Sequence, residues 1–152
     1  MRRVSFGLET GSQALLDAME KGSSVEANSA FIRHAFEAGL SIRTTMFRGF
    51  PGETAEDMAA TADFLEVHER WLDRVSFNEF VLLHDTPIYH ATARSPSSDA
   101  LRADPRNAIS RFRSPVGRDR HYRRELRRAL SSVYRINRKA LRSDARQFDG
   151  LM

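Results

Sequence analysis

Cysteine is absent from this chain of 152 residues. Without a thiol, the chain itself can form no disulfide, no thiolate nucleophile and no cysteine-ligated zinc or iron–sulfur site. Long apolar runs are also missing, because no stretch reaches the roughly 18 uninterrupted apolar residues of a membrane span. The first ten residues, MRRVSFGLET, carry two arginines but neither the apolar core nor the cleavage site of a secretion signal. The expected location is therefore the cytoplasm.

Acidic residues are scarce in the second part of the chain. Residues 1–93 contain 8 Lys and Arg against 14 Asp and Glu, whereas residues 94–152 contain 16 against 6. The formal net charge of +4 therefore combines an acidic body with a basic end, which indicates two parts with different tasks or partners. The length suffices for one domain but is short for a complete α/β barrel, which needs about 250 residues.

The most informative stretch is TTMFRGFPGET at residues 44–54. Residues Ser41–Arg48 are rich in β-branched and apolar types, which predicts a strand. Pro51 and Gly52 then fit a type II turn, because proline presets φ at the second position and glycine accepts a positive φ at the third. Thr54 can cap the helix that follows. This strand–turn–helix unit places the turn at the carboxyl end of a strand, where α/β proteins place their chemistry.

The rest of the first 93 residues continues the same alternation of strands and helices. Its order is β-α-α-β-α-β, with crossovers long enough for right-handed parallel connections. A parallel sheet that begins at residue 3 suggests that further elements precede it, on another chain or in a longer parent. Strands are predicted at Arg3–Leu8, Ser41–Phe47 and Arg74–Leu83, and helices at residues 13–22, 23–39, about 55–70 and 88–93.

Residues 94–118 change character and predict a linker or irregular segment, punctuated by proline and serine, with one helical turn at Ala108–Phe112. A basic amphipathic helix is predicted within residues 119–146, from Asp119 to about Ser143. Its arginines could face water, pair with the acidic body, or bind RNA, a membrane surface or a protein partner. Its apolar stripe is expected at Tyr122, Leu126, Leu130, Val133, Asn137 and Leu141.

Polar residues follow each of the three predicted strands. Because the carboxyl ends of parallel strands meet at one edge, these groups could form a shared ligand pocket. The alternative is that turns are simply polar and rich in glycine. The groups are Glu9–Ser12, Thr45 with Gly49–Glu53, and Asn78–Glu79 with His84–Asp85.

Three segments together resemble a known family: VSFGLETGSQALLDAMEKG, TTMFRGFPGETAEDMAATADFL and RVSFNEFVLLHDTPIY. They are similar to the second half of a radical S-adenosylmethionine (radical SAM) domain, in the branch that includes cobalamin-binding members and methylthiotransferases. The resemblance covers about residues 3–90. It implies an α/β fold that is half of a TIM-type β/α barrel, with about three parallel strands in residues 1–93, followed by the basic helix.

The resemblance implies a set of residues that bind S-adenosylmethionine. Glu9 would lie near the ribose, with Ser12 just beyond it. Lys21 stands where many members have an arginine that approaches the methionyl carboxylate, and it keeps the charge but not the bidentate fork.

The second and third segments would form the adenine site. The motif Met46–Gly49 matches the family strand that lies against adenine, Glu53 would tie the turn down, and Phe80–Leu82 would supply the other wall. His84–Asp85 departs from the Pro-Gly that the family usually has before Thr-Pro-Ile-Tyr. The complete implied set is Glu9, Ser12, Lys21, Thr45, Met46, Phe47, Gly49, Glu53, Phe80 and Val81.

The large departure from the family is the missing three-cysteine loop, which would ligate a [4Fe–4S] cluster. Without the cluster this chain alone is expected to be catalytically silent, so that a missing N-terminal barrel half or a longer parent chain would have to supply it. Cobalamin is a possible further cofactor, and the substrate, a small molecule or RNA, is open. Two alternatives stand beside this interpretation: a non-catalytic α/β fragment that binds RNA or a protein through its basic helix, and an unrelated complete α/β domain.

Overall fold

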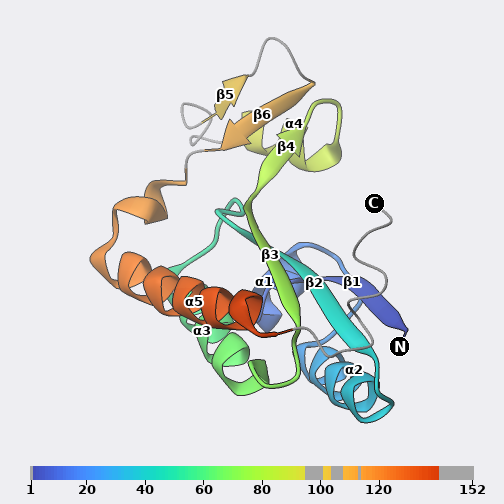
Figure 1. Cartoon of the computed structure of the whole chain (residues 1–152). Coiled ribbons are helices and arrows are strands. Elements are labelled where there is room, and N and C mark those ends of the chain that lie inside the picture. Colours follow the sequence, from blue (N-terminus) through green and yellow to red (C-terminus); the bar gives the residue numbers. More distant parts are fainter. Residues whose placement is uncertain (1, 95–100, 104–107, 113, 141–152) are drawn as a thin grey trace.

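The computed structural model describes residues 2–94, 101–103, 108–112 and 114–140. Its central feature is a sheet of three parallel strands, β1 (Arg3–Glu9), β2 (Ser41–Arg48) and β3 (Arg74–Glu79), in the order β1-β2-β3 (Figure 1). Helices connect the strands in the predicted order β-α-α-β-α-β. The α/β prediction is confirmed, and the sheet with its helices corresponds to part of a β/α barrel.

Four helices accompany this sheet: α1 (Gln13–Ala18), α2 (Val25–Glu37), α3 (Ala55–His68) and α5 (Arg120–Arg138). A single apolar core contains strand residues together with residues of α2, α3 and α5. Strand residues Ile42 and Met46 are completely buried in this core. Because side chains alternate along a strand, Thr45 and Phe47 lie on the opposite face of the sheet.

The turn after β2 has the predicted geometry. Gly52 has a φ of +88°, the left-handed value that a type II turn requires at this position. The Glu53 backbone N–H donates to the Phe50 carbonyl over 3.0 Å, which closes the turn. Thr54 then caps α3, and Asp57 completes a capping box with it. The strand therefore ends and the helix begins within six residues, which fixes the rim of the sheet at this point.

A second, antiparallel sheet follows, with strands β4 (Val81–Leu83), β6 (Ile109–Phe112) and β5 (Leu101–Ala103) in the order β4-β6-β5. Helix α4 (Pro87–Ala93) lies between β4 and β5 in sequence. The prediction of one continuous strand over Arg74–Leu83 is wrong, because the chain leaves the parallel sheet at Phe80. The Phe80 N–H donates to the Arg48 carbonyl over 2.8 Å, and β4 then pairs with β6 instead.

The helical turn predicted at Ala108–Phe112 is also wrong, because this stretch forms β6. Pairing on both sides, with β4 and with β5, supplies the hydrogen bonds that decide its conformation. The predicted basic helix is present as α5, which Asp119 caps, after a short 3-10 helix at Pro115–Arg118. Residues 141–146 of the prediction, with Leu141, lie outside the described residues, and the division into three segments stays a prediction.

Helix α5 packs along α3 and against the edge of β3 (Figure 1). The Asn137 side chain pairs with the backbone of Val75, accepting from its N–H over 2.8 Å and donating to its carbonyl over 2.9 Å. This amide takes the place of a neighbouring strand at the edge of the sheet. Leu130, predicted in the apolar stripe, is 41% exposed, and the buried positions include Ala129 and Ile136 instead.

Candidate functional site

A cavity of about 500 Å³ lies at the carboxyl edge of the parallel sheet. Its wall is built from five places in the chain: the end of β1, the end of α1, the β2 strand with its turn, the Phe80 position between the sheets, and α4. The volume falls in the range of about 300–1,000 Å³ that is usual for small-molecule sites. Of the polar side chains predicted to share a pocket, Glu9 is the one in the described lining, and the other two strand ends contribute phenylalanines.

The acidic side of the cavity is formed by Glu9, which is only 6% exposed. The register of β1 against β2 shifts between Gly7 and Glu9, and Glu9 takes a φ of +65°. Such a bulge redirects a side chain at the end of a strand. Gly7 makes room for the carboxylate, because a Cβ at Gly7 would lie 2.4 Å from Glu9 Oε1.

The Glu9 carboxylate is paired on one oxygen only. Lys21 Nζ lies 2.6 Å from Glu9 Oε1, and the lysine also lines the cavity. Glu9 Oε2 is buried and has no hydrogen-bond partner among the residues that the structure describes. A buried acceptor without a partner is unusual and costly in a folded protein.

The opposite side of the cavity is aromatic. Phe80 contacts Phe47 with ring centroids 6.0 Å apart and Phe50 with centroids 4.9 Å apart, both in edge-on arrangements. All three phenylalanines line the cavity, and Ile88 of α4 adds a further apolar contact. Planar, weakly polar rings pack well against such a wall.

Glu53 supports this wall from behind and does not line the cavity. Its Oε2 accepts from the Gly49 N–H over 2.5 Å and from the Tyr122 hydroxyl over 2.9 Å. Burial raises the pKa of Glu53 to about 7, against the lowering effect of these two hydrogen bonds. The carboxyl group thereby joins the turn that carries Phe50 to the first turn of α5.

The remaining predicted residues lie around the cavity rather than in its described lining. Ser12 caps α1 and donates to Asp57 over 2.5 Å, so it ties α1 to α3. Thr45 lines a second cavity of about 300 Å³. Met46 is fully buried in the core, and Val81 is 37% exposed in β4.

The structure therefore brings four predicted residues into one cavity: Glu9, Lys21, Phe47 and Phe80. Sequence reasoning did not single out Phe50 or the α4 residue Ile88 as lining residues. The sequence feature that could have indicated Phe50 as a lining residue is its position in the turn, directly after Gly49. The role of every one of these residues toward a cofactor stays a prediction.

The position where the sequence departs from the family pattern has an informative conformation. Asp85 has a φ of +63°, in the left-handed region that glycine adopts without strain. The backbone thus keeps the shape that the usual glycine would allow, although the side chain differs. His84 contacts Ser110 of β6 over 2.8 Å, which joins this turn to the second sheet.

The residues of this chain do not fit an iron–sulfur cluster. Such clusters need thiolate ligands, and the sequence contains no cysteine. Among the described residues there is also no group of three or more His, Asp or Glu side chains placed to hold a metal ion. Within the same part of the chain, no helix combines the length and apolarity needed to cross a membrane.

Comparison with known proteins shows that the chain is similar to methylthiotransferases. No protein-family model matches it. It is 30% identical to the ribosomal protein uS12 methylthiotransferase RimO of Acidithiobacillus ferrooxidans, over 95% of the chain and 34% of the relative. It is 39% identical to RimO of Actinobacillus succinogenes over 59% of the chain and 19% of the relative.

A eukaryotic relative, the mitochondrial tRNA methylthiotransferase CDK5RAP1 of Mus musculus, is 35% identical over 42% of the chain and 11% of its own length. The homologues are methylthiotransferases, which belong to the radical SAM superfamily, and the resemblance predicted from the sequence is confirmed. The chain spans about a third or less of the length of these relatives.

Proposed function

We propose that this chain forms one wall of an S-adenosylmethionine site in a radical SAM protein of the methylthiotransferase type. The observation that carries the proposal is the cavity at the strand ends, whose lining combines the carboxylate of Glu9 and the ammonium of Lys21 with three phenylalanines. This combination suits a nucleoside, which presents hydroxyl donors on one side and a flat ring on the other.

Each side of the cavity would hold one part of the cofactor. The Glu9 carboxylate would accept from a ribose hydroxyl, and Phe47 and Phe80 would pack against the adenine. Lys21, which is paired with Glu9 here, would supply a positive charge for the methionyl carboxylate. Glu53 would hold the turn that carries Phe50 and would not touch the cofactor.

The ligands of the iron–sulfur cluster would have to come from a partner half or from a longer parent chain. In radical SAM proteins the cluster supplies the electron that cleaves S-adenosylmethionine, and this chain has no ligand for it. We therefore propose that the chain alone binds the cofactor without cleaving it, and that a cysteine-bearing barrel half is its partner. Strand β1 pairs with β2 alone among the described strands, and we propose that a further parallel strand of the partner pairs with its other edge. Nothing in the described cavity selects for cobalamin, which forms no part of the proposed function.

Isothermal titration calorimetry with S-adenosylmethionine tests the proposal. We expect binding to the chain and tighter binding after a cysteine-bearing partner half is added. Glu9→Gln should weaken binding about tenfold, because it replaces a charge-assisted hydrogen bond by a neutral one. Glu37→Gln, an exposed carboxylate on α2, is the matched control and should leave binding unchanged. No binding with or without the partner half would contradict the proposal.

A further inference from the structure

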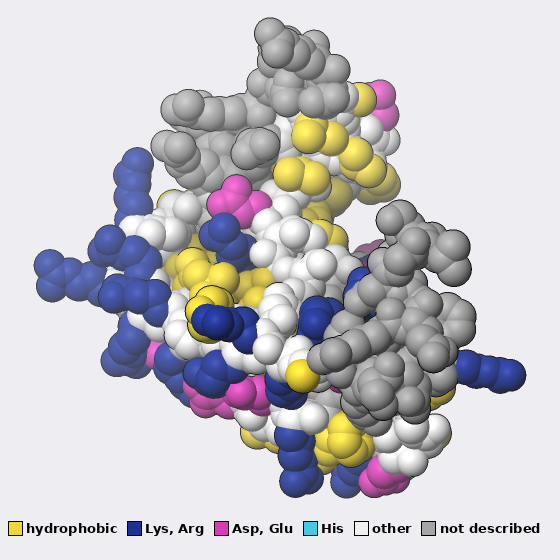
Figure 2. Space-filling view, in the orientation of Figure 1, with side chains coloured by type: hydrophobic (Ala, Val, Ile, Leu, Met, Phe, Trp, Pro, Cys, Tyr) yellow, Lys and Arg dark blue, Asp and Glu magenta, His cyan; other side chains and the backbone are white. Residues whose placement is uncertain are grey.

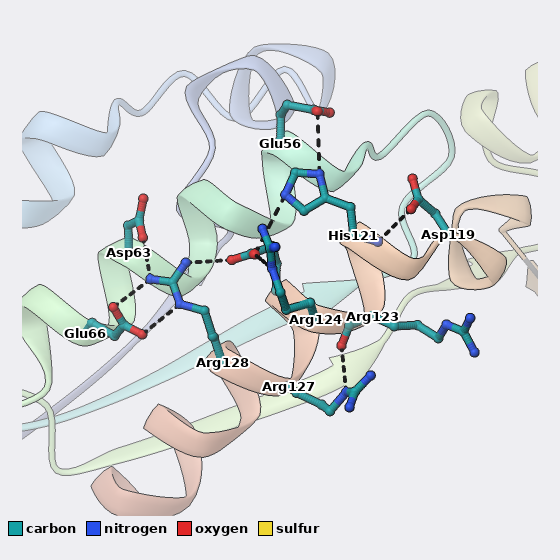
Figure 3. A network of polar contacts seen from close by, with 10 residues as sticks. Glu56, Asp63, Glu66, Asp119, His121, Arg123, Arg124, Arg127 and Arg128 are labelled. Carbon is teal, nitrogen blue, oxygen red and sulfur yellow. Dashed lines mark hydrogen bonds and ion pairs between the residues drawn. The ribbon is translucent and has the colours of Figure 1, made fainter.

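Helix α5 carries two classes of arginine, which the structure separates by their partners. On the side that packs against α3, Arg128 lies 2.7 Å from both Asp63 and Glu66 (Figure 3). Arg135 lies 2.9 Å from Glu69 on the same side. These arginines neutralise the acidic face of α3. Their charge is therefore used within the fold and is not available to a partner.

The outer side of α5 has no such compensation. Figure 3 shows Arg123 and Arg127 directed away from the carboxylates of α3. Within the described residues, no Asp or Glu forms an ion pair with the exposed arginines of this side, and Figure 2 shows basic side chains gathered over the helix. Like charges four residues apart, as in Arg123 and Arg127, destabilise a helix by about 0.2–0.5 kcal/mol. We call this surface the outer arginine face; it comprises Arg118, Arg120, Arg123, Arg127 and Arg138.

An exposed aromatic ring lies on the same helix. Tyr134 is 59% exposed, and the Arg138 guanidinium lies over its ring, 5.2 Å from the centroid. An accessible aromatic ring beside arginines is the combination on which unpaired bases stack. Tyr122, the other tyrosine of the helix, is buried against Glu53 and cannot serve in this way.

A membrane surface fits this helix less well. Interfacial helices insert an apolar face into the lipid boundary. The apolar residues Ala129, Val133 and Ile136 of α5 are instead buried in the core with α3. The accessible face is thus cationic, with Tyr134 and Leu130 as its exposed large apolar side chains, over a helix about 29 Å long.

We propose that the outer arginine face, together with Tyr134, binds single-stranded RNA. The arginines contact successive phosphates, and Tyr134 stacks on a base. This binding uses none of the residues of the proposed S-adenosylmethionine site. It can therefore succeed or fail independently of that proposal.

Fluorescence anisotropy with a labelled 12-nucleotide oligouridine tests the proposal on the full chain, at salt concentrations from 50 to 400 mM. Five phosphate contacts predict a slope of log affinity against log salt of about −3.5. The double variant Arg123→Gln/Arg127→Gln should lower affinity about tenfold and make the slope shallower by about 1.4. The matched control is Arg2→Gln/Arg33→Gln, which removes the same charge from exposed positions away from α5. It should change the affinity and the slope less than the α5 double variant does.

Tyr134→Ala should lower RNA affinity at least fivefold without changing the slope, and Tyr134→Phe should restore it. Circular dichroism verifies that every variant is folded. Equal losses in the two double arginine variants would overturn the proposal, because net charge alone would then explain binding. A slope shallower than −1 would also overturn it. The proposal would also be overturned if the chain bound phosphatidylserine vesicles as tightly as RNA and if Tyr134→Ala changed neither affinity.

Discussion

Glu53 makes the stability of this protein depend on pH in a predictable direction. Its folded-state pKa of about 7 lies above the ordinary value of 4.5, chiefly because the carboxyl group is buried. Between these two values the folded chain holds a proton that the unfolded chain has released. The stabilisation is fully present below pH 4.5 and is lost as pH rises through about 7.

The size of the effect follows from the two pKa values. Their difference corresponds to about 3 kcal/mol of unfolding free energy lost between pH 4.5 and 8. Glu53→Gln replaces the carboxyl group with a neutral group of the same shape that keeps an acceptor for Gly49 and Tyr122. We expect the variant to match the parent near pH 5 and to be more stable by up to about 3 kcal/mol at pH 8.

Urea unfolding, followed by the fluorescence of Trp71, the single tryptophan, measures this difference at several pH values. Burial lowers the pKa of His68, but this histidine is present in both proteins and its effect cancels in the comparison. Tyr122→Phe removes a donor that favours the ionised carboxylate, so it should cost more at pH 8 than at pH 5. A flat difference between Glu53→Gln and the parent from pH 5 to 8 would refute the reasoning.

Two further substitutions test packing around the site. Gly11→Ala should lower the free energy of unfolding in urea by about 2 kcal/mol, because the new Cβ would lie within 2.9 Å of backbone atoms of α3. In the control variant Gly117→Ala, the new Cβ meets no atom within 4 Å, so the stability should not change. Equal effects of the two would contradict this account. Asn137→Ala should cost about 2 kcal/mol and speed hydrogen exchange at Val75, since it removes both side-chain bonds to that edge residue. The exposed Asn78→Ala is its control, and unchanged exchange at Val75 would count against the edge-pairing role.

The parallel sheet and its turn could be predicted because local signals and tertiary structure agree there. Pro51 and Gly52 specify the turn, Thr54 specifies the helix start, and the strands alternate as their burial requires. The break at Phe80 could not be predicted in this way, because Arg74–Leu83 has strand propensity throughout. A contact with the Arg48 carbonyl and pairing with a distant strand end the first sheet there.

The candidate site was predictable only in part for a related reason. The resemblance located Glu9, Lys21, Phe47 and Phe80, and the structure places all four around one cavity. It could not show that the backbone of Glu9 is left-handed, since a glutamate at positive φ is uncommon and has no sequence signature. It also could not show that α4 lines the cavity, which depends on how the chain turns back after β4.

Helix α5 carries a basic surface and also holds in place two elements that support the candidate site. Near its start, Tyr122 holds Glu53, and near its end, Asn137 pairs with the edge of β3. Those two contacts fix the turn that carries Phe50 and one of the three strands that support it. Arginines on the α3 side strengthen the same attachment, whereas those on the outer arginine face form no ion pair with α3 or β3 among the described residues. The outer arginine face thus contributes little to holding α5 in place, as the proposal that this face binds RNA requires.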